Sequence, residues 1–170
     1  MGLRFLVPVL TNMLESETGS EDSIVEGNII TGFASGIYSR NSRNTVIKGN
    51  TISDLSSHGI YLLGETINIV VSENAIYNID PDVGICGIWI NRGSSGMYPG
   101  DPSGVVSNNS IEAGALPGIY ANDNLGEGIE FINNRIVTSG YPYHSPATYP
   151  LTYFHKIVGY FRGRTSFDFN

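Results

Sequence analysis

An acidic chain of 170 residues, with a net charge of −7 and 21 glycines, has the length of one domain and can bury a sizeable core. Its composition excludes a mainly helical protein, because Ala, Leu, Glu and Lys are scarce, and a disordered one, because Ile, Val and aromatic residues are plentiful. The acidic charge argues against nucleic-acid binding, no apolar run is long enough for a membrane span, and the single cysteine, Cys86, excludes an internal disulfide.

Residues 1–22 precede the repeated part of the chain, and we expect them to form an N-terminal cap or an incomplete first coil. The apolar run at the N-terminus is short, is broken by Pro8 and has no small-residue cleavage site nearby. These features argue against a signal peptide.

One asparagine recurs at intervals of 22 to 35 residues between positions 23 and 137. A Val, Ile or Phe stands three residues before each of these asparagines and an Ile two residues after it, whereas the positions between are mostly polar or mixed. Alternation of this kind is the period-2 pattern of strands with one buried face. The recurring residues are Asn28, Asn50, Asn74, Asn109 and Asn134.

A second phrase, Gly-Ile-aromatic, follows four of these asparagines and predicts a third short strand in each repeat. Three strands and three turns per repeat fit a continuous coil, in which each strand lies parallel to its equivalent one coil later. The phrase begins at Gly36, Gly59, Gly87 and Gly118.

The repeat, best seen in residues 46–52 (VIKGNTI) with 59–61 (GIY), resembles that of the pectin lyase-like superfamily. The resemblance covers residues 23–137 and implies an all-β fold: a right-handed, single-stranded parallel β-helix of about five coils, between non-repeating caps at 1–22 and 138–170. The superfamily includes lyases, hydrolases, epimerases, viral tailspikes, adhesins and non-catalytic domains, so the resemblance leaves the function open. It favours an extracellular or virion-associated location.

Each recurring asparagine is predicted to lie at a sharp bend, because Asn tolerates the left-handed conformation better than other non-glycine residues. Stacked one coil apart, at roughly 4.8 Å, the side-chain amides can form a ladder of hydrogen bonds inside the turn. We therefore interpret these asparagines as structural.

Strand parity predicts an outward column of aromatic side chains, because the Ile of each Gly-Ile-aromatic phrase faces the core. Aromatic rings stack on the apolar faces of sugars, and nearby amides reach their hydroxyl groups, so this face is a candidate for binding a polysaccharide or oligosaccharide. The alternatives are cross-strand stabilisation and an interface between protomers. The candidate binding residues are Tyr38, Tyr61, Trp89, Tyr120, Asn91 and Asn122, beside a long loop at 90–104.

Two acidic residues near this face, Asp101 and Asp123, are weak candidates for the paired carboxylates of a glycoside hydrolase or polysaccharide lyase. They come from different loops, and the alternative is that both are solvated turn residues. Asp80 and Asp82 flank a proline in an insertion at 77–86 and give weak support for a Ca²⁺ site. No other cofactor is indicated, and the histidines, His58, His144 and His155, show no metal-ligand spacing and are interpreted as turn or tail residues.

The C-terminal segment 138–170 departs from the repeat and contains 9 of the 17 Tyr and Phe residues from position 141 onward. The open end of a β-helix must be covered, so the segment is predicted to form a cap. The concentration of aromatic residues also suits a subunit interface, which would make the protein a homo-oligomeric spike or assembly module through residues 141–170.

Overall fold

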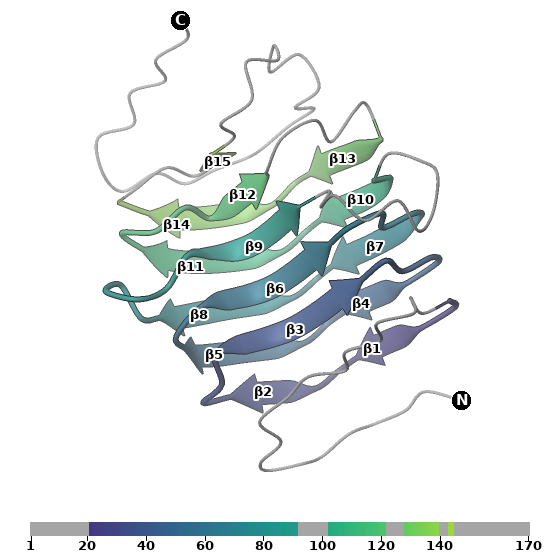
Figure 1. Cartoon of the computed structure of the whole chain (residues 1–170). Helices are drawn as coiled ribbons and strands as arrows, with labels where there is room; N and C mark the ends of the chain where they lie inside the picture. The colour runs from purple at the N-terminus through teal and green to yellow at the C-terminus, as the bar shows by residue number, and fades with distance from the viewer. Residues whose placement is uncertain (1–20, 92–101, 122–127, 140–142, 145–170) are drawn as a thin grey trace, which may run out of the picture.

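A computed structural model describes residues 21–91, 102–121, 128–139 and 143–144, and these residues form three parallel sheets of five strands each. The chain winds through the sheets in turn, so that successive coils stack from β1 and β2 at one end to β12 and β14 at the other (Figure 1). The predicted parallel β-helix is therefore confirmed. No helix long and apolar enough to span a membrane occurs in the described residues.

Each coil gives one strand to each sheet, and equivalent strands of neighbouring coils pair in parallel. The first sheet contains β1 (Ile24–Glu26), β4 (Val46–Lys48), β7 (Ile69–Ser72), β10 (Gly104–Ser107) and β13 (Ile129–Ile132). The second contains β2 (Ile29–Thr31), β5 (Thr51–Leu55), β8 (Ala75–Ile79), β11 (Ser110–Gly114) and β14 (Arg135–Thr138). The third contains β3 (Ser35–Arg40), β6 (His58–Leu63), β9 (Cys86–Asn91), β12 (Ile119–Ala121) and β15 (Tyr143–His144).

The core consists of columns of aliphatic side chains that point inward from all three sheets. Ile47, Ile52 and Ile60 show the arrangement in one coil, where each side chain is at most 1% exposed. Burying an Ile side chain contributes about 1.5–3 kcal/mol, and stacking equivalent residues repeats that contribution at every coil. Side chains that point outward are far more exposed to solvent, and Ile29 on β2 is an example at 74%.

The asparagine ladder predicted from the sequence is present at the turn between the first and second sheets. The Asn50 side-chain amide donates to Asn74 Oδ1 at 2.9 Å and to the Val25 carbonyl at 2.9 Å, while its own Oδ1 accepts from Asn28 Nδ2 at 2.9 Å. The Asn50 backbone N–H also donates to Asn74 Oδ1, at 3.0 Å. These contacts satisfy buried amides that would otherwise be costly in an apolar interior.

The left-handed residue at this turn is the one before each ladder asparagine, and the expectation that the asparagine itself takes this conformation is wrong. The reason is that the ladder side chain must point into the turn, so the reversal of the backbone occurs one residue earlier, at a position facing solvent. The left-handed residues are Gly27, Gly49, Glu73, Asn108 and Asn133, with φ from 52° to 66°.

Candidate functional site

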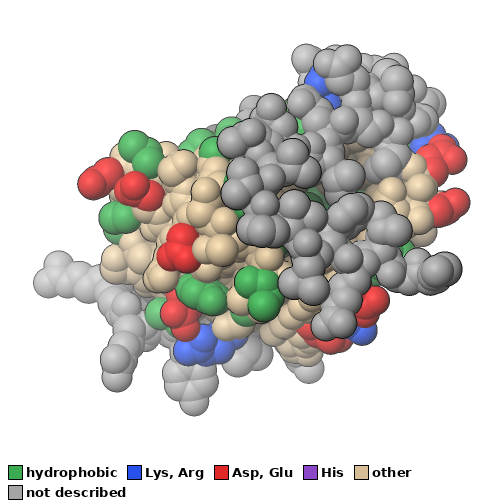
Figure 2. Space-filling model, turned by 90° about the horizontal axis from the view of Figure 1, so that it is seen from below, with side chains coloured by type: hydrophobic (Ala, Val, Ile, Leu, Met, Phe, Trp, Pro, Cys, Tyr) green, Lys and Arg blue, Asp and Glu red, His purple; other side chains and the backbone are tan. Residues whose placement is uncertain are grey.

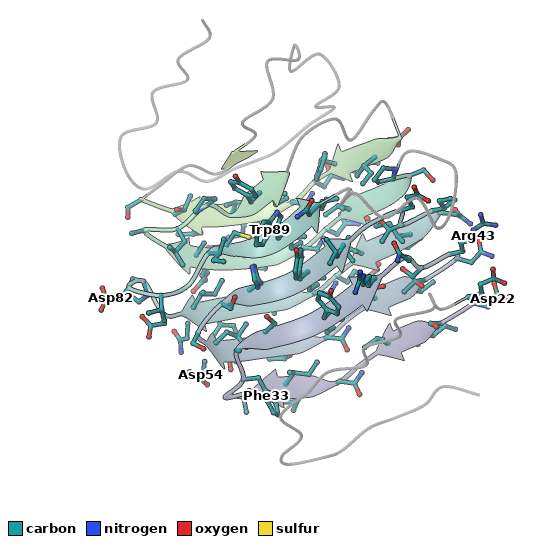
Figure 3. All side chains as sticks on the ribbon, in the orientation of Figure 1. Asp22, Phe33, Arg43, Asp54, Asp82 and Trp89 are labelled. Carbon is teal, nitrogen blue, oxygen red and sulfur yellow. The ribbon has the colours of Figure 1, made fainter. Side chains whose placement is uncertain are left out.

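Four aromatic side chains lie in line across the outer face of the third sheet, one from each of four successive strands. We call Tyr38, Tyr61, Trp89 and Tyr120 the aromatic column; they are direct register partners on β3, β6, β9 and β12, and each is half-buried. Trp89 lies on β9 in the face turned toward the viewer in Figure 3. The register places these side chains on one surface, as strand parity predicts.

The rings of the aromatic column are in contact along its whole length. Tyr61 and Trp89 stack with ring centres 4.7 Å apart and an angle of 19° between their planes. Tyr38 meets Tyr61 at 5.1 Å and 66°, and Tyr120 meets Trp89 at 5.5 Å and 88°. The middle pair therefore turns its faces toward each other, and the two end rings stand across that stack.

Glycines stack in a column near the start of these strands, where a side chain would not fit. A Cβ atom at Gly59 would collide with the Gly87 carbonyl oxygen and with Ile76 Cγ2. The backbone at Gly59 thus faces the interior, as does Ile60 after it, and this local break in alternation brings His58 to the same side of the sheet as Tyr61.

His58 is part of the aromatic face, although its sequence position was interpreted as a turn. Its ring centre lies 4.8 Å from those of both Tyr61 and Trp89, and the residue is only 6% exposed. Nδ1 lies 2.7 Å from Ser57 Oγ and 3.1 Å from Ser35 Oγ. Burial lowers the pKa of His58 to about 4, so the ring is neutral near pH 7.

Two ring nitrogens on this face, His58 Nε2 and Trp89 Nε1, are buried and have no hydrogen-bond partner among the described residues. Buried polar atoms are normally hydrogen-bonded, so these two nitrogens are exceptions to the general pattern.

The next outward row beside the aromatic column carries a basic, an apolar and an amide side chain. Arg40, Leu63 and Asn91 are register partners, and each is half-buried. Asn91 Nδ2 donates to the Tyr61 hydroxyl at 3.4 Å, which connects this row to the aromatic column. The candidates Asn122, Asp101 and Asp123, and most of the 90–104 loop, lie outside the described residues.

The insertion before β9, residues 77–86, contains a turn that is held by a hydrogen bond within the insertion. Asp80 Oδ1 accepts a hydrogen bond from the Asp82 backbone N–H at 2.9 Å, so this carboxylate fixes a turn. Within the described parts of the chain, no three His, Cys, Asp or Glu side chains converge in a way that could hold a metal ion. Cys86 is buried, and burial raises the pKa of its thiol, which leaves it unreactive as a nucleophile.

Comparison with known proteins gives one match. Residues 18–147 match the family model described as the right-handed beta helix region. No curated protein and no solved structure matches the chain. The match spans the coils that carry the asparagine ladder, the inward Ile columns and the aromatic column. The chain therefore belongs to the right-handed β-helix family.

Proposed function

We propose that the outer face of the third sheet binds a carbohydrate through the aromatic column. The observation that carries this proposal is the unbroken, in-register contact of four half-buried aromatic rings along the coil axis. Aromatic side chains that are half-buried in such a row present apolar surface on which sugar C–H groups can stack.

Polar groups beside the rings support recognition of hydroxyl groups. The Asn91 amide lies next to the Tyr61 hydroxyl, and amide and hydroxyl groups can both hydrogen-bond to sugar hydroxyls. Because the chain carries a net charge of −7, a neutral glycan is favoured over a polyanionic one.

Trp89 provides the test, because it is the only tryptophan in the sequence. We expect its fluorescence emission to change saturably when the correct neutral oligosaccharide is titrated into the protein. Tyr61→Ala should weaken binding about tenfold, which corresponds to about 1.4 kcal/mol, because it removes a ring that stacks directly on Trp89.

Tyr77→Ala serves as the matched control. Tyr77 is a half-buried tyrosine on β8, in the second sheet, and it lies outside the proposed face. Its loss should leave the affinity unchanged. An unchanged Trp89 emission across a broad panel of neutral oligosaccharides, or equal losses in the two variants, would contradict the proposal.

A further inference from the structure

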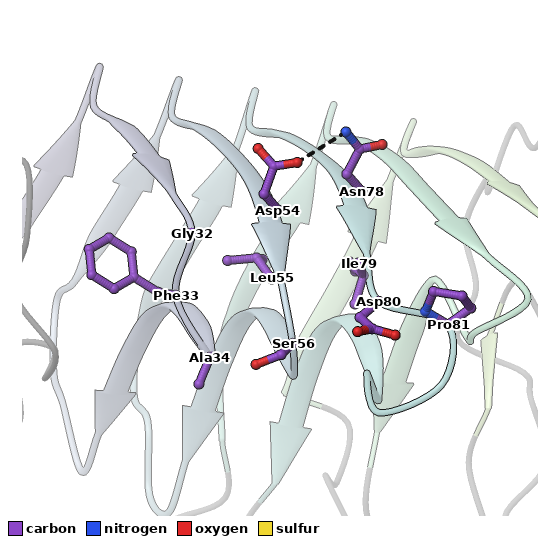
Figure 4. A pocket seen from close by; sticks show the side chains of 10 residues that line it. All are labelled: Gly32, Phe33, Ala34, Asp54, Leu55, Ser56, Asn78, Ile79, Asp80 and Pro81. Carbon is purple, nitrogen blue, oxygen red and sulfur yellow. Dashed lines mark hydrogen bonds between the residues drawn. The ribbon is translucent and has the colours of Figure 1, made fainter.

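A groove separate from the aromatic face opens at the corner between the second and third sheets. It has a volume of about 590 Å³ and is lined by residues 32–34, 54–56 and 78–81 (Figure 4). These segments are equivalent parts of three successive coils. The Ser56 N–H donates to the Phe33 carbonyl at 3.1 Å, and the Asp80 N–H donates to the Leu55 carbonyl at 2.8 Å. The groove therefore runs from coil to coil.

The lining of the groove combines polar side chains at its two sides with apolar residues. Asp54 and Asn78 lie on one side, and Ser56 and Asp80 lie on the other (Figure 4). Between them are the buried side chains of Leu55 and Ile79, with the half-buried Phe33 and the exposed Pro81 also in the lining. Carboxylates together with the accessible surface of Phe33 and Pro81 suit a side chain that has a hydrocarbon stem and a cationic end.

The Asp54 carboxylate is held in place by neighbouring coils. It accepts hydrogen bonds from Thr31 Oγ1 at 2.7 Å, Ser53 Oγ at 3.0 Å and Asn78 Nδ2 at 3.2 Å. These bonds lower the pKa of Asp54 and keep the group ionised. Among the described residues, neither Asp54 nor Asp80 has a Lys or Arg partner within 4.0 Å, whereas Lys48 and Arg135 are each paired with a glutamate.

The turn that follows Asp80 presents exposed hydrophobic residues in a fixed conformation. The Gly84 N–H donates to the Asp80 carbonyl at 2.8 Å, and the Ile85 N–H donates to the Ser57 carbonyl at 2.8 Å. Val83 and Ile85 are nevertheless 60% and 38% exposed. Exposed apolar residues beside a groove, on a turn already held by hydrogen bonds, are typical of a protein-binding surface.

We propose that this groove docks an extended segment of a partner protein through an arginine side chain flanked by apolar residues. Charge complementarity selects this occupant, since the described residues that line the groove include two carboxylates, Asp54 and Asp80, and no basic side chain. The guanidinium group pairs with the groove carboxylates, and the methylene groups of the arginine pack against the half-buried Phe33 and the exposed Pro81. Val83 and Ile85 contact the apolar neighbours of the arginine. This interaction is independent of carbohydrate binding on the third sheet.

The experiment uses two acetylated and amidated tripeptides, Leu-Arg-Leu and Leu-citrulline-Leu, added to the full ¹⁵N-labelled chain. Citrulline has nearly the shape of arginine but no charge. We expect Leu-Arg-Leu to cause saturable shifts of the backbone amide signals of residues 54–57 and 80–85, and the citrulline peptide to bind at least tenfold more weakly. Increasing salt should weaken the arginine peptide alone.

A double variant, Asp54→Asn with Asp80→Asn, should lower the affinity at least tenfold while the fold is kept. Asn tolerates the left-handed conformation of Asp54, where φ is 55°, and Asn78 has φ 53° at the equivalent position of the next coil. An Asn at position 80 can still accept from the Asp82 N–H, as Asp80 does. Thermal unfolding checks the fold of the variant.

The matched control is Asp22→Asn. Asp22 is also an exposed, left-handed aspartate that accepts from a neighbouring coil, and it lies on the opposite side of the molecule from Asp54 and Asp82 (Figure 3). Acidic side chains occur at several separate places on the surface (Figure 2), so this control separates the groove from general acidity. The proposal is overturned by an absence of saturable shifts, by shifts located elsewhere, by equal binding of the two peptides, or by an equal loss in Asp22→Asn. The peptide comparison needs no variant, so the proposal stays testable even if the double variant does not fold.

Discussion

Asn74 lies in the middle of the asparagine ladder and makes hydrogen bonds to both neighbouring coils. Its Oδ1 accepts from the Asn50 backbone N–H and side chain, and its Nδ2 donates to Asn109 Oδ1 at 2.9 Å and to the Ile47 carbonyl at 3.0 Å. A side chain with this many buried partners cannot be removed without leaving other polar groups unpaired. At the scale of single residues, the ladder is therefore a major determinant of stability.

We predict that Asn74→Ala lowers the free energy of unfolding by about 3 kcal/mol, because the Asn50 N–H groups lose their acceptor and the Asn109 and Ile47 oxygens lose a donor. Asn68→Gly is the control. The Asn68 side chain is exposed and donates to Asn44 Oδ1 at 2.8 Å, and glycine keeps its left-handed backbone, with φ 54°. Asn68→Gly should lower the free energy of unfolding by less than about 1 kcal/mol. Urea unfolding measures both, and equal costs would show that burial of the ladder does not matter.

His58 makes stability depend on pH. Burial lowers its pKa from the usual 6.5 to about 4, so between these values the unfolded chain binds a proton that the folded protein excludes. The free energy of unfolding should therefore fall as the pH is lowered from about 6.5 to about 4. His58→Gln should flatten the curve in this window, measured by urea unfolding at several pH values. If the variant shows the same pH dependence as the natural chain, His58 is not the group responsible.

At the scale of single strands, the side-chain alternation was readable from the sequence because it repeats at every coil. Ile47 and Ile52 have equivalents in neighbouring coils, and the asparagine between them fixes the turn. The left-handed position was misplaced by one residue, since Gly, Glu and Asn all occupy it and no single residue type marks it. His58 was missed because strict alternation from Ile60 turns it inward, whereas the inward-facing Gly59 breaks that alternation.

Gly59 is predicted to be indispensable to the third sheet. Gly59→Ala should destabilise the protein by about 2 kcal/mol or more, because the new Cβ meets the Gly87 carbonyl and the Ile76 side chain. The contrasting change, Gly49→Asn, should be nearly neutral. Gly49 has φ 61° with nothing within 4 Å of its Cβ position, and an asparagine, Asn108, occupies the equivalent position in another coil. Thermal unfolding distinguishes the two, and a neutral Gly59→Ala would refute the close approach seen here.

The corner groove was beyond the reach of sequence analysis for a different reason. Its walls come from three coils, and the residues that matter, Asp54, Ser56 and Asp80, share no recurring residue type with their equivalents. Repetition identifies the residues that build the fold. Residues that differ between equivalent positions of successive coils mark where the surface is not repetitive. Only the register of the coils shows which of these residues lie together.

At the scale of the whole molecule, each coil packs mainly against the coils before and after it. Among the described residues, the strands of the first coil pair on one side only, Ile24 and Ile29 are 54% and 74% exposed, and Asn28 Oδ1, where the ladder ends, has no hydrogen-bond partner. In a linear array of this kind, local stability should decrease toward an end that has fewer neighbours.

Amide hydrogen exchange should show this gradient. We expect the amides of β1 and β2 to exchange faster than those of β5 and β8, which pair with strands on both sides. Uniform protection from β1 to β8 would mean that the described coils unfold as one cooperative unit.

The central claim is that the aromatic column is a carbohydrate-binding surface, and the indole N–H of Trp89 tests it most directly. With one tryptophan in the sequence, the ¹H–¹⁵N spectrum contains a single indole signal, and it comes from a ring in the middle of the aromatic column. Titration with a neutral oligosaccharide should move this signal saturably, with the same dissociation constant as the change in Trp89 emission. An indole signal that stays fixed, while the glycan panel is titrated to millimolar concentration, would contradict the claim.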